Sequence, residues 1–325
     1  MILKILVILL LFICNLNAIN ISETGDKHNI LGDSSVYFDE FNVEDIDSID
    51  EQLFTEYNTN KVDLGLIKSS LWIKIDLFND TLFEKERILY FDNFALDYIT
   101  LYTKSGDRYK EYNEGVFRER EFNNIINPYF QISLKPNEEK VFYLKVKSNT
   151  TALNFKLFLL TNEQLYIEES NKQLILSLFL GGLIALILYN TFIYFFTKDL
   201  AYFFYVLYIL TFTIGHSYLT GMHLFLINGH FEYLLVRIFV IMTIFLLIFI
   251  KVILNLKKYK FLNYGIHGFT GALILLFVML SKDFYPVPLA MSIMLSAMFY
   301  ILFICFYLIK ETREVRYIIV GWIFA

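Results

Sequence analysis

Long apolar runs in the second half of the sequence constrain this chain more than any other feature. A helix rises about 1.5 Å per residue, so about twenty residues cross the roughly 30 Å of a bilayer's hydrocarbon. Runs of this length cover residues 174–196, 201–219, 234–254, 261–280 and 287–309, and a sixth begins at 317 and continues to 325. We predict an α-helical transmembrane bundle over residues 166–325, and we expect the protein to continue beyond the sixth run.

The charges divide the chain into two halves of different character. Residues 1–171 hold 17 basic and 28 acidic residues, whereas residues 172–325 hold 11 and 5. The first half is therefore an acidic, water-facing segment, while the second is mildly basic and strongly apolar. Because the basic residues of the second half lie in short loops between apolar runs, we expect no nucleic-acid partner.

The first eighteen residues have the layout of an export signal. Lys4 supplies a positive charge, residues 5–13 form a short apolar core, and Ala18 is a small residue at a cleavage position. We predict a signal peptide over residues 1–18 and an exported domain behind it. Cys14 lies in this signal and Cys305 in an apolar run, so the exported domain folds without disulfides.

Short strands separated by turn sequences occupy the exported segment. In LWIKIDLF, residues 71–78, every second residue is apolar, which is typical of a strand with one buried face. Similar runs follow at residues 87–91, 98–104, 129–134, 141–147 and 153–160. We predict an antiparallel β-sandwich over residues 19–165, a short helix or loop at 41–57, and a linker at 162–172.

The distribution of lysine and arginine predicts the orientation in the membrane. An exported first domain places the loops at 197–200, 255–260 and 310–316 in the cytoplasm. These loops and the adjoining helix ends hold eight Lys or Arg residues, whereas the outer loops at 220–233 and 281–286 hold one. Positive residues favour the cytoplasmic side, so this count agrees with the export signal.

The first two spans carry a resemblance to a receptor family. The stretch LGGLIALILYNTFIYFFTKDLAYFFYVLYILTFTIG, residues 180–215, resembles the seven-transmembrane bacterial receptors with diverse intracellular signalling modules. The similar features are Gly181, Gly182, Tyr189, Asn190, Tyr202, Tyr205, Tyr208, Gly221 and the run RYIIVGW that ends at Trp322. We expect these residues to pack the bundle.

The exported segment resembles the second type of extracellular domain found in these receptors. LWIKIDLFND, FALDYITLYTKSG and NPYFQISL with VFYLKVKS carry this similarity, between residues 71 and 148. The resemblance implies a jelly-roll-like sandwich, similar to carbohydrate-binding modules, on a receptor of the bacterial inner membrane with this domain in the periplasm. It also implies three partners: the lipid bilayer, a small outer ligand such as a sugar, and a cytoplasmic signalling domain in the same chain. A homodimer is a further candidate assembly.

Three residues of the sandwich are candidate ligand contacts. Trp72 and Tyr102 offer rings on which a sugar could stack, although strand aromatics more often serve packing. Arg118, in the sequence FRERE, offers a cation for an anion, against the alternative of a solvated charge run. We keep both interpretations open for each residue.

Several polar residues of the spans have alternative interpretations. Asn190 is either an interhelical hydrogen-bonding group or a hydrated interfacial one. Arg237, in the third span, either extends to the outer headgroups or takes part in sensing. His216, His223 and His230 are spaced by seven residues, about 10.5 Å along a helix, so separate interfacial roles are favoured over a metal site.

The sequence contains no motif that predicts catalysis or a cofactor. It lacks a Gly-rich phosphate loop, a nucleophile elbow and a His-Glu-x-x-His sequence. A signalling receptor is therefore the leading hypothesis. The alternatives are a multi-span transporter or channel subunit with an exported accessory domain, and an adhesion module that the bundle anchors.

Overall fold

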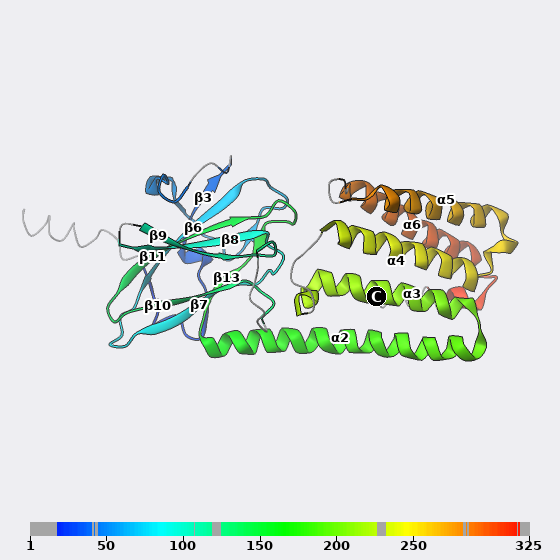
Figure 1. Cartoon of the computed structure of the whole chain (residues 1–325), viewed down its shortest axis with the longest axis horizontal. Coiled ribbons are helices and arrows are strands. Elements are labelled where there is room, and N and C mark those ends of the chain that lie inside the picture. Colours follow the sequence, from blue (N-terminus) through cyan, green and yellow to red (C-terminus); the bar gives the residue numbers. More distant parts are fainter. Residues whose placement is uncertain are drawn as a thin grey trace, which may run out of the picture. The chain divides into compact units, whose positions relative to one another are not determined.

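The computed structural model describes residues 18–40, 42, 45–106, 108–118, 125–225, 232–281, 284, 286–316 and 318. Strands come first along the chain, and long helices follow (Figure 1). The strands are β1 (Ile19–Asn20), β2 (Lys27–Asn29), β3 (Ser35–Asp39), β4 (Thr55–Glu56), β5 (Val62–Asp63), β6 (Ser70–Phe78), β7 (Lys85–Phe91), β8 (Tyr98–Ser105), β9 (Arg108–Glu114), β10 (Tyr129–Leu134), β11 (Glu139–Lys147), β12 (Asn154–Phe155) and β13 (Leu157–Leu160). The helices are α2 (Asn162–Thr197), α3 (Leu200–Thr220), α4 (Glu232–Ile253), α5 (Lys260–Met279) and α6 (Val287–Leu308).

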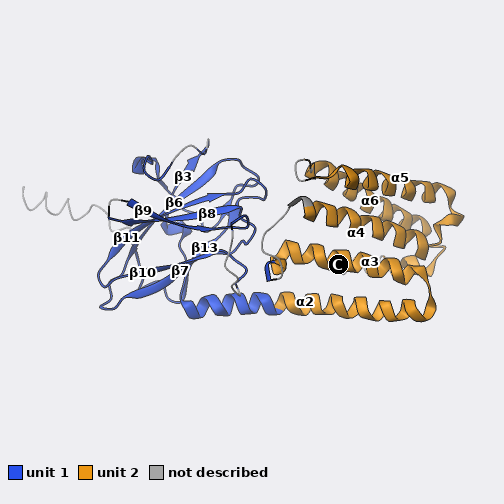
Figure 2. Cartoon of the chain, in the orientation of Figure 1, with its two compact units in different colours: residues 1–174, 224–230 blue, residues 175–223, 231–325 orange. Residues whose placement is uncertain are grey.

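The chain forms two compact units (Figure 2). One comprises residues 1–174 and 224–230 and holds the strands, and the other comprises residues 175–223 and 231–325 and holds the helices. The division falls inside α2, after Leu174. The predicted fold class, an antiparallel β-sandwich followed by a bundle of apolar helices, is confirmed.

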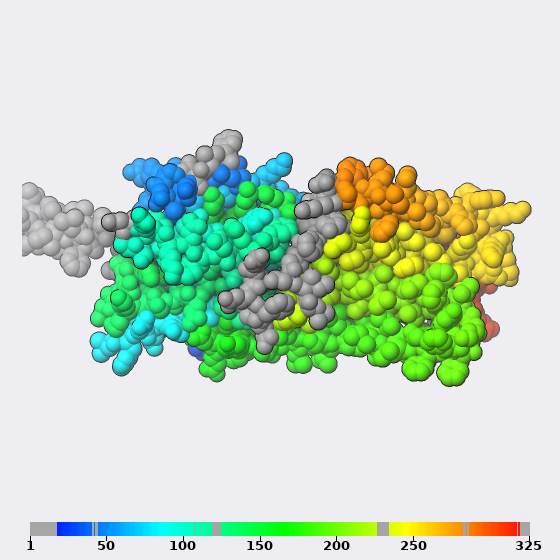
Figure 3. Space-filling model, in the orientation of Figure 1, coloured from blue at the N-terminus to red at the C-terminus, as the bar shows by residue number. Residues whose placement is uncertain are grey.

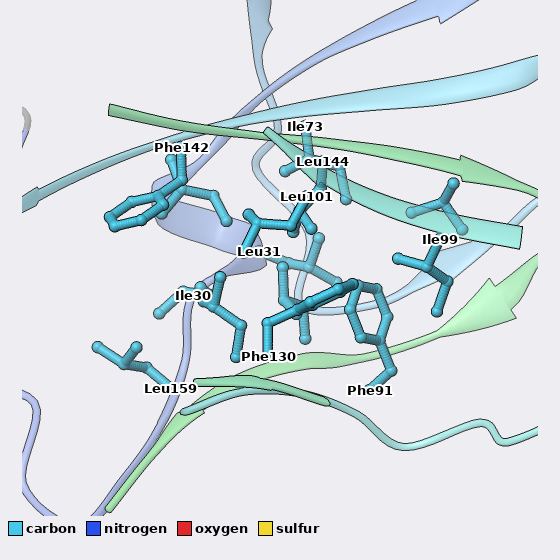
Figure 4. Packing of buried hydrophobic residues seen from close by; sticks show 14 of the residues in the cluster. Ile30, Leu31, Ile73, Phe91, Ile99, Leu101, Phe130, Phe142, Leu144 and Leu159 are labelled. Atoms are coloured by element: carbon cyan, nitrogen blue, oxygen red, sulfur yellow. The ribbon is translucent and has the colours of Figure 1, made fainter. Parts of the chain in front are cut away.

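Two sheets enclose the core of the first unit. The larger sheet has the strand order β4-β3-β6-β11-β8-β9, with β1 beside β6, and the second has the order β10-β7-β13-β2. Inward-facing side chains of both sheets meet in one apolar cluster, which includes Ile73, Phe91, Phe130 and Leu144 (Figure 4). This is the interior that alternating strands build when two sheets pack face to face.

Two central strands are buried on their outer faces as well. Leu89 and Phe91 of β7 point into the core, while Ile88 and Tyr90 pack on the other side with Leu165 of α2. In β6, Trp72 lies on the outer face and is also buried. The sequence ILYF at the end of β7 is continuously apolar because both of its faces are covered.

The second unit contains five described helices that are long and apolar enough to cross a membrane. Their bounds differ most from the prediction at α2, which begins at Asn162 instead of 174. Residues 162–172, predicted as a linker, form the first turns of that helix because Leu165 packs against the sandwich. Figure 3 shows side chains of α2, in green, uncovered on one face, as a lipid-facing helix requires.

The contact between α5 and α6 depends on a glycine. A Cβ atom added at Gly265 would lie 2.1 Å from the hydroxyl oxygen of Tyr300, which donates a hydrogen bond to the carbonyl of Leu262 at 3.0 Å. We expect Gly265→Ala to displace the ring and destabilise the helix pair by roughly 1–2 kcal/mol, measured by thermal unfolding in nanodiscs. Gly268→Ala is the matched control, since an added Cβ meets no atom there within 4 Å. Equal effects of the two substitutions would contradict this packing.

Candidate functional site

The aromatic residues predicted to contact a ligand lie beneath a covering segment, which we define as residues 45–54. Trp72 is 0% exposed and its ring stacks on that of Tyr102 at 5.5 Å, with the Lys145 ammonium 4.8 Å from the indole centre. Both rings pack in one cluster with Ile46 and Phe54 of this segment. Neither ring is open to a ligand in this conformation, so stacking on a sugar would require the covering segment to move.

The covering segment is held to the sheet by polar contacts of Glu51. Its carboxylate accepts a hydrogen bond from the Tyr143 hydroxyl at 2.9 Å and lies 3.2 Å from the Lys74 ammonium. The hydrogen bond from Tyr143, followed by that from Lys74, lowers the pKa of Glu51. Because Glu51 is largely exposed, we assign this ion pair little stabilising energy.

Arg118 packs on a different ring, although its charge acts on the Tyr102 hydroxyl and opposes the rise that burial causes in the pKa of Tyr102. Its guanidinium stacks over Tyr98 at 5.3 Å, and Tyr98 contacts Phe117 at 5.8 Å. The side chain of Arg118 is exposed, and its described partner is an aromatic face. Arg120, the other arginine of FRERE, lies outside the described residues.

The described sandwich contains a polar cavity with a volume of about 550 Å³. It lies at one edge of β6, where β3 pairs with residues 70–74 and β1 with residues 77–78, so the edge at 75–76 is left between them. Its lining residues carry mostly amide, hydroxyl, carboxylate and amine groups: Ala18, Ile19, Asn20, Glu23, Thr24, His28, Gly32, Asp33, Ser34, Ser35, Glu56, Asn58, Lys74 and Asp76. Sequence reasoning missed this cavity because its residues come from separate short strands and turns.

Asp76 is the most unusual side chain of this polar cavity. Its Oδ1 atom is buried, and no hydrogen bond reaches it from the described residues. Burial raises the pKa of Asp76, while Lys74 opposes that rise. A buried acceptor without a donor costs free energy, so such a group in a cavity is a candidate for binding a ligand donor.

Other polar groups of the cavity have partners within the protein. The imidazole of His28 lies 2.8 Å from a carboxylate oxygen of Asp33, and Lys74 contacts Glu51 of the covering segment. The cavity has a net negative charge because Glu23, Glu56 and Asp76 also line it. This combination of acceptors and hydroxyl groups suits a ligand with several donors, such as a polyhydroxylated molecule.

A buried polar network, which we call the α2 clamp, joins the first turns of α2 to the sandwich. The Glu169 carboxylate is 2% exposed and accepts hydrogen bonds from the Tyr90 hydroxyl at 2.9 Å and from the backbone N–H of Ile126 at 2.7 Å. The Tyr90 hydroxyl also accepts a hydrogen bond from Asn127, whose side-chain oxygen accepts one from Lys172 at 2.6 Å.

Burial shifts the pKa values of two groups in the clamp. It lowers the pKa of Lys172, against the opposing charges of Glu169 and Asp92, and it raises the pKa of Tyr90. Lys172 also lies over the ring of Phe94, at 5.9 Å. A satisfied buried network of this kind holds one geometry, because each broken hydrogen bond leaves a desolvated group.

In the helical unit, the residues that resemble the receptor family differ in their surroundings. Asn190 is 7% exposed and donates a hydrogen bond to the carbonyl of Leu186 at 2.8 Å, and Tyr202 and Tyr205 line a cavity with it. By contrast, Tyr189 is 64% exposed, and Cβ atoms at Gly181 and Gly182 would meet nothing within 4 Å. The remaining members differ again: Tyr208 packs on Tyr205 and Phe212, Gly221 ends α3 with a φ of 80°, and Trp322 lies outside the described residues.

Arg237 and two of the histidines have defined partners. Arg237 donates a hydrogen bond to the carbonyl of Leu280, the residue that follows α5. His223 is 3% exposed and stacks on Tyr218 at 4.0 Å, and His216 packs between Phe179 and Phe212. His230 lies outside the described residues, so the structure does not place the three histidines together.

Comparisons with known proteins match both units. Residues 172–325 match the family model described as 7TM diverse intracellular signalling, and residues 32–161 match the one described as 7TMR-DISM extracellular 2. The two matches follow each other in the order that the sequence resemblance predicts. No curated protein sequence matched the chain.

Proposed function

Because the chain belongs to the 7TMR-DISM receptors and carries their second type of extracellular domain, we propose that it senses a small ligand outside the cell. In this proposal the sandwich binds the ligand and the helices pass the change to a cytoplasmic signalling module in the same protein. The chain itself then acts as a receptor without catalytic activity. Its location would be the bacterial inner membrane, with the sandwich in the periplasm.

The polar cavity beside β6 is the ligand site that we propose. The observation that carries this choice is Asp76, whose buried Oδ1 lacks a donor in a cavity of about 550 Å³. A sugar supplies several hydroxyl donors, and the lining offers the carboxylates and amides that would accept them. The jelly-roll-like sandwich would thus bind its sugar at the sheet edge, while the aromatic face stays covered.

The α2 clamp supports the relay part of the proposal. Because Glu169 and Lys172 are bonded into the sandwich, a shift of Tyr90 or Asn127 must displace the first turns of α2. The helix then continues without interruption to Thr197. A ligand that favours one packing of the sandwich would in this way bias the packing of the bundle.

Asp76→Asn tests the site through two opposite effects. An asparagine removes the buried charge, so we expect the sandwich to gain at most about 1 kcal/mol of stability, allowing for solvent around this half-buried group. We also expect it to lose binding of the sugar that the wild-type protein selects from a panel, measured by calorimetry on the full chain in nanodiscs. Together these effects mark a residue kept for binding at the expense of stability.

The gain from Asp76→Asn should depend on pH with a definite sign. Because the pKa of Asp76 is raised in the folded protein, its negative charge destabilises the fold fully at pH values above the folded-state pKa. This destabilisation disappears as the pH falls toward 3.8, the ordinary pKa of an aspartate. Asp80→Asn is the control with the opposite sign, because hydrogen bonds from Asn20 and Ser22 lower the pKa of Asp80. Sugar binding that survives Asp76→Asn would rule out this cavity as the ligand site.

A further inference from the structure

The helical unit contains a cavity of its own, of about 470 Å³, beside the turn between α2 and α3. We call it the hairpin cavity. The residues that line it come from α2, the turn after it, α3, α4 and the turn of helix at 313–316: Asn190, Asp199, Ala201, Tyr202, Tyr205, Phe249, Val252, Ile253 and Glu314. It holds polar groups from distant parts of the sequence together with apolar side chains.

Two exposed carboxylates, those of Asp199 and Glu314, line the hairpin cavity. Asp199 uses Oδ1 to accept a hydrogen bond from the N–H of Ala201 at 2.9 Å, which caps α3 and leaves Oδ2 available. No ion pair reaches Asp199 or Glu314 from the described residues. Two negative charges facing one cavity repel each other, so a cation bound between them would be attracted by both.

Asn190 adds an independent acceptor. Its side chain is 7% exposed, its amide nitrogen donates to Leu186, and within the described residues its amide oxygen receives no hydrogen bond. An amide oxygen that lines a cavity can accept a hydrogen bond from water or from a ligand. The donor that fits beside two carboxylates is positively charged.

Aromatic rings form another part of the lining. Tyr205 and Phe249 lie 5.2 Å apart between ring centres, and Tyr202 contributes a further phenol. Aromatic faces attract cations by about 0.5–2 kcal/mol, most strongly where water is excluded. Val252, Ile253 and Ala201 provide apolar contacts for the carbon atoms attached to such a cation.

We propose that the hairpin cavity is a binding site for a primary ammonium group. Asn190, Asp199 and Glu314 accept its three N–H hydrogen bonds, and the aromatic rings pack against its charge. A quaternary ammonium has no N–H donor and would leave these acceptors unpaired. The group can come from the ethanolamine headgroup of a membrane lipid or from a soluble amine, and the proposal does not depend on the outer ligand site.

Lipid titration of the full chain, followed by native mass spectrometry, tests this proposal. The probes are phosphatidylethanolamine, its N-methylated derivatives, phosphatidylcholine and phosphatidylglycerol, and free ethanolamine is tested as a competitor. We expect phosphatidylethanolamine to bind about tenfold more tightly than phosphatidylcholine, with intermediate values for the N-methylated series. If free ethanolamine binds but no lipid is preferred, the ammonium site stands and its source is soluble.

Charge-removing variants assign the binding to this cavity. Asp199→Asn combined with Glu314→Gln should abolish the preference while keeping the helix cap, because asparagine caps helices as well as aspartate does. Glu311→Gln is the control, since Glu311 accepts a hydrogen bond from Tyr259 and does not line the cavity. Equal binding of all the lipids without any effect of ethanolamine, or a preference that persists in the double variant, would overturn the proposal.

Discussion

Trp72→Ala should lower the free energy of unfolding of the sandwich by about 3–5 kcal/mol, the cost of removing a large, fully buried aromatic side chain. The indole lies on the outer face of β6, between that strand and the covering segment. Its loss removes the stack with Tyr102 and the contact of Lys145 with the ring. Hydrogen exchange at the amides of β6 and β11 would measure this loss.

The matched control for Trp72 is Tyr112→Ala. Tyr112 is 41% exposed on β9, with Lys110 over its ring at 4.8 Å, so we expect a change of less than about 1 kcal/mol. The comparison also separates two roles for Trp72. A variant that keeps its stability and loses sugar binding would make Trp72 a ligand contact and would show that the covering segment does not bury it.

Glu169→Ala should have the second largest effect, a loss of about 3 kcal/mol. The substitution leaves the Tyr90 hydroxyl and the N–H of Ile126 without their acceptor, and it leaves the buried charge of Lys172 with less compensation. Buried donors and charges without partners cost about 1–3 kcal/mol each, less whatever water can enter the site. Hydrogen exchange in residues 162–174 should increase accordingly.

The neighbouring residue provides the control for Glu169. Glu168 forms an ion pair with Lys27 at 2.7 Å, with both side chains about one third exposed. We expect Glu168→Ala to cost less than about 1 kcal/mol, as is usual for surface ion pairs. If the two alanine variants lose equal stability, the α2 clamp is not a buried network and does not support the proposed relay.

Local patterns predicted the main elements correctly. The alternation of LWIKIDLF corresponds to β6, and the apolar runs correspond to helices because a membrane-spanning helix needs only length and hydrophobicity. The strand predictions failed for segments whose structure depends on hydrogen bonding to a neighbouring strand. Arg108–Glu114 lacks apolar alternation and still forms β9, because it pairs along β8.

A second failure came from a run read as one strand. Residues 153–160 split at Lys156 into β12, which pairs with β5, and β13, which pairs with β7. The alternation of buried apolar residues continues across Lys156, from Leu153 to Leu159, so it does not mark the change of partner. The candidate site shows the same limit, since Asp76 of β6 and His28 of β2 line one cavity although their strands belong to different sheets.

The sequence by itself determined the division into an acidic strand-forming segment and an apolar helical one, because these depend on residue type and period. It also carried the resemblance that the family comparisons confirmed. Only the tertiary structure decided that Trp72 is covered, that Asp76 lacks a donor, and that the supposed linker is the start of α2. These properties depend on which distant segments pack together, and burial and hydrogen bonding follow from that packing.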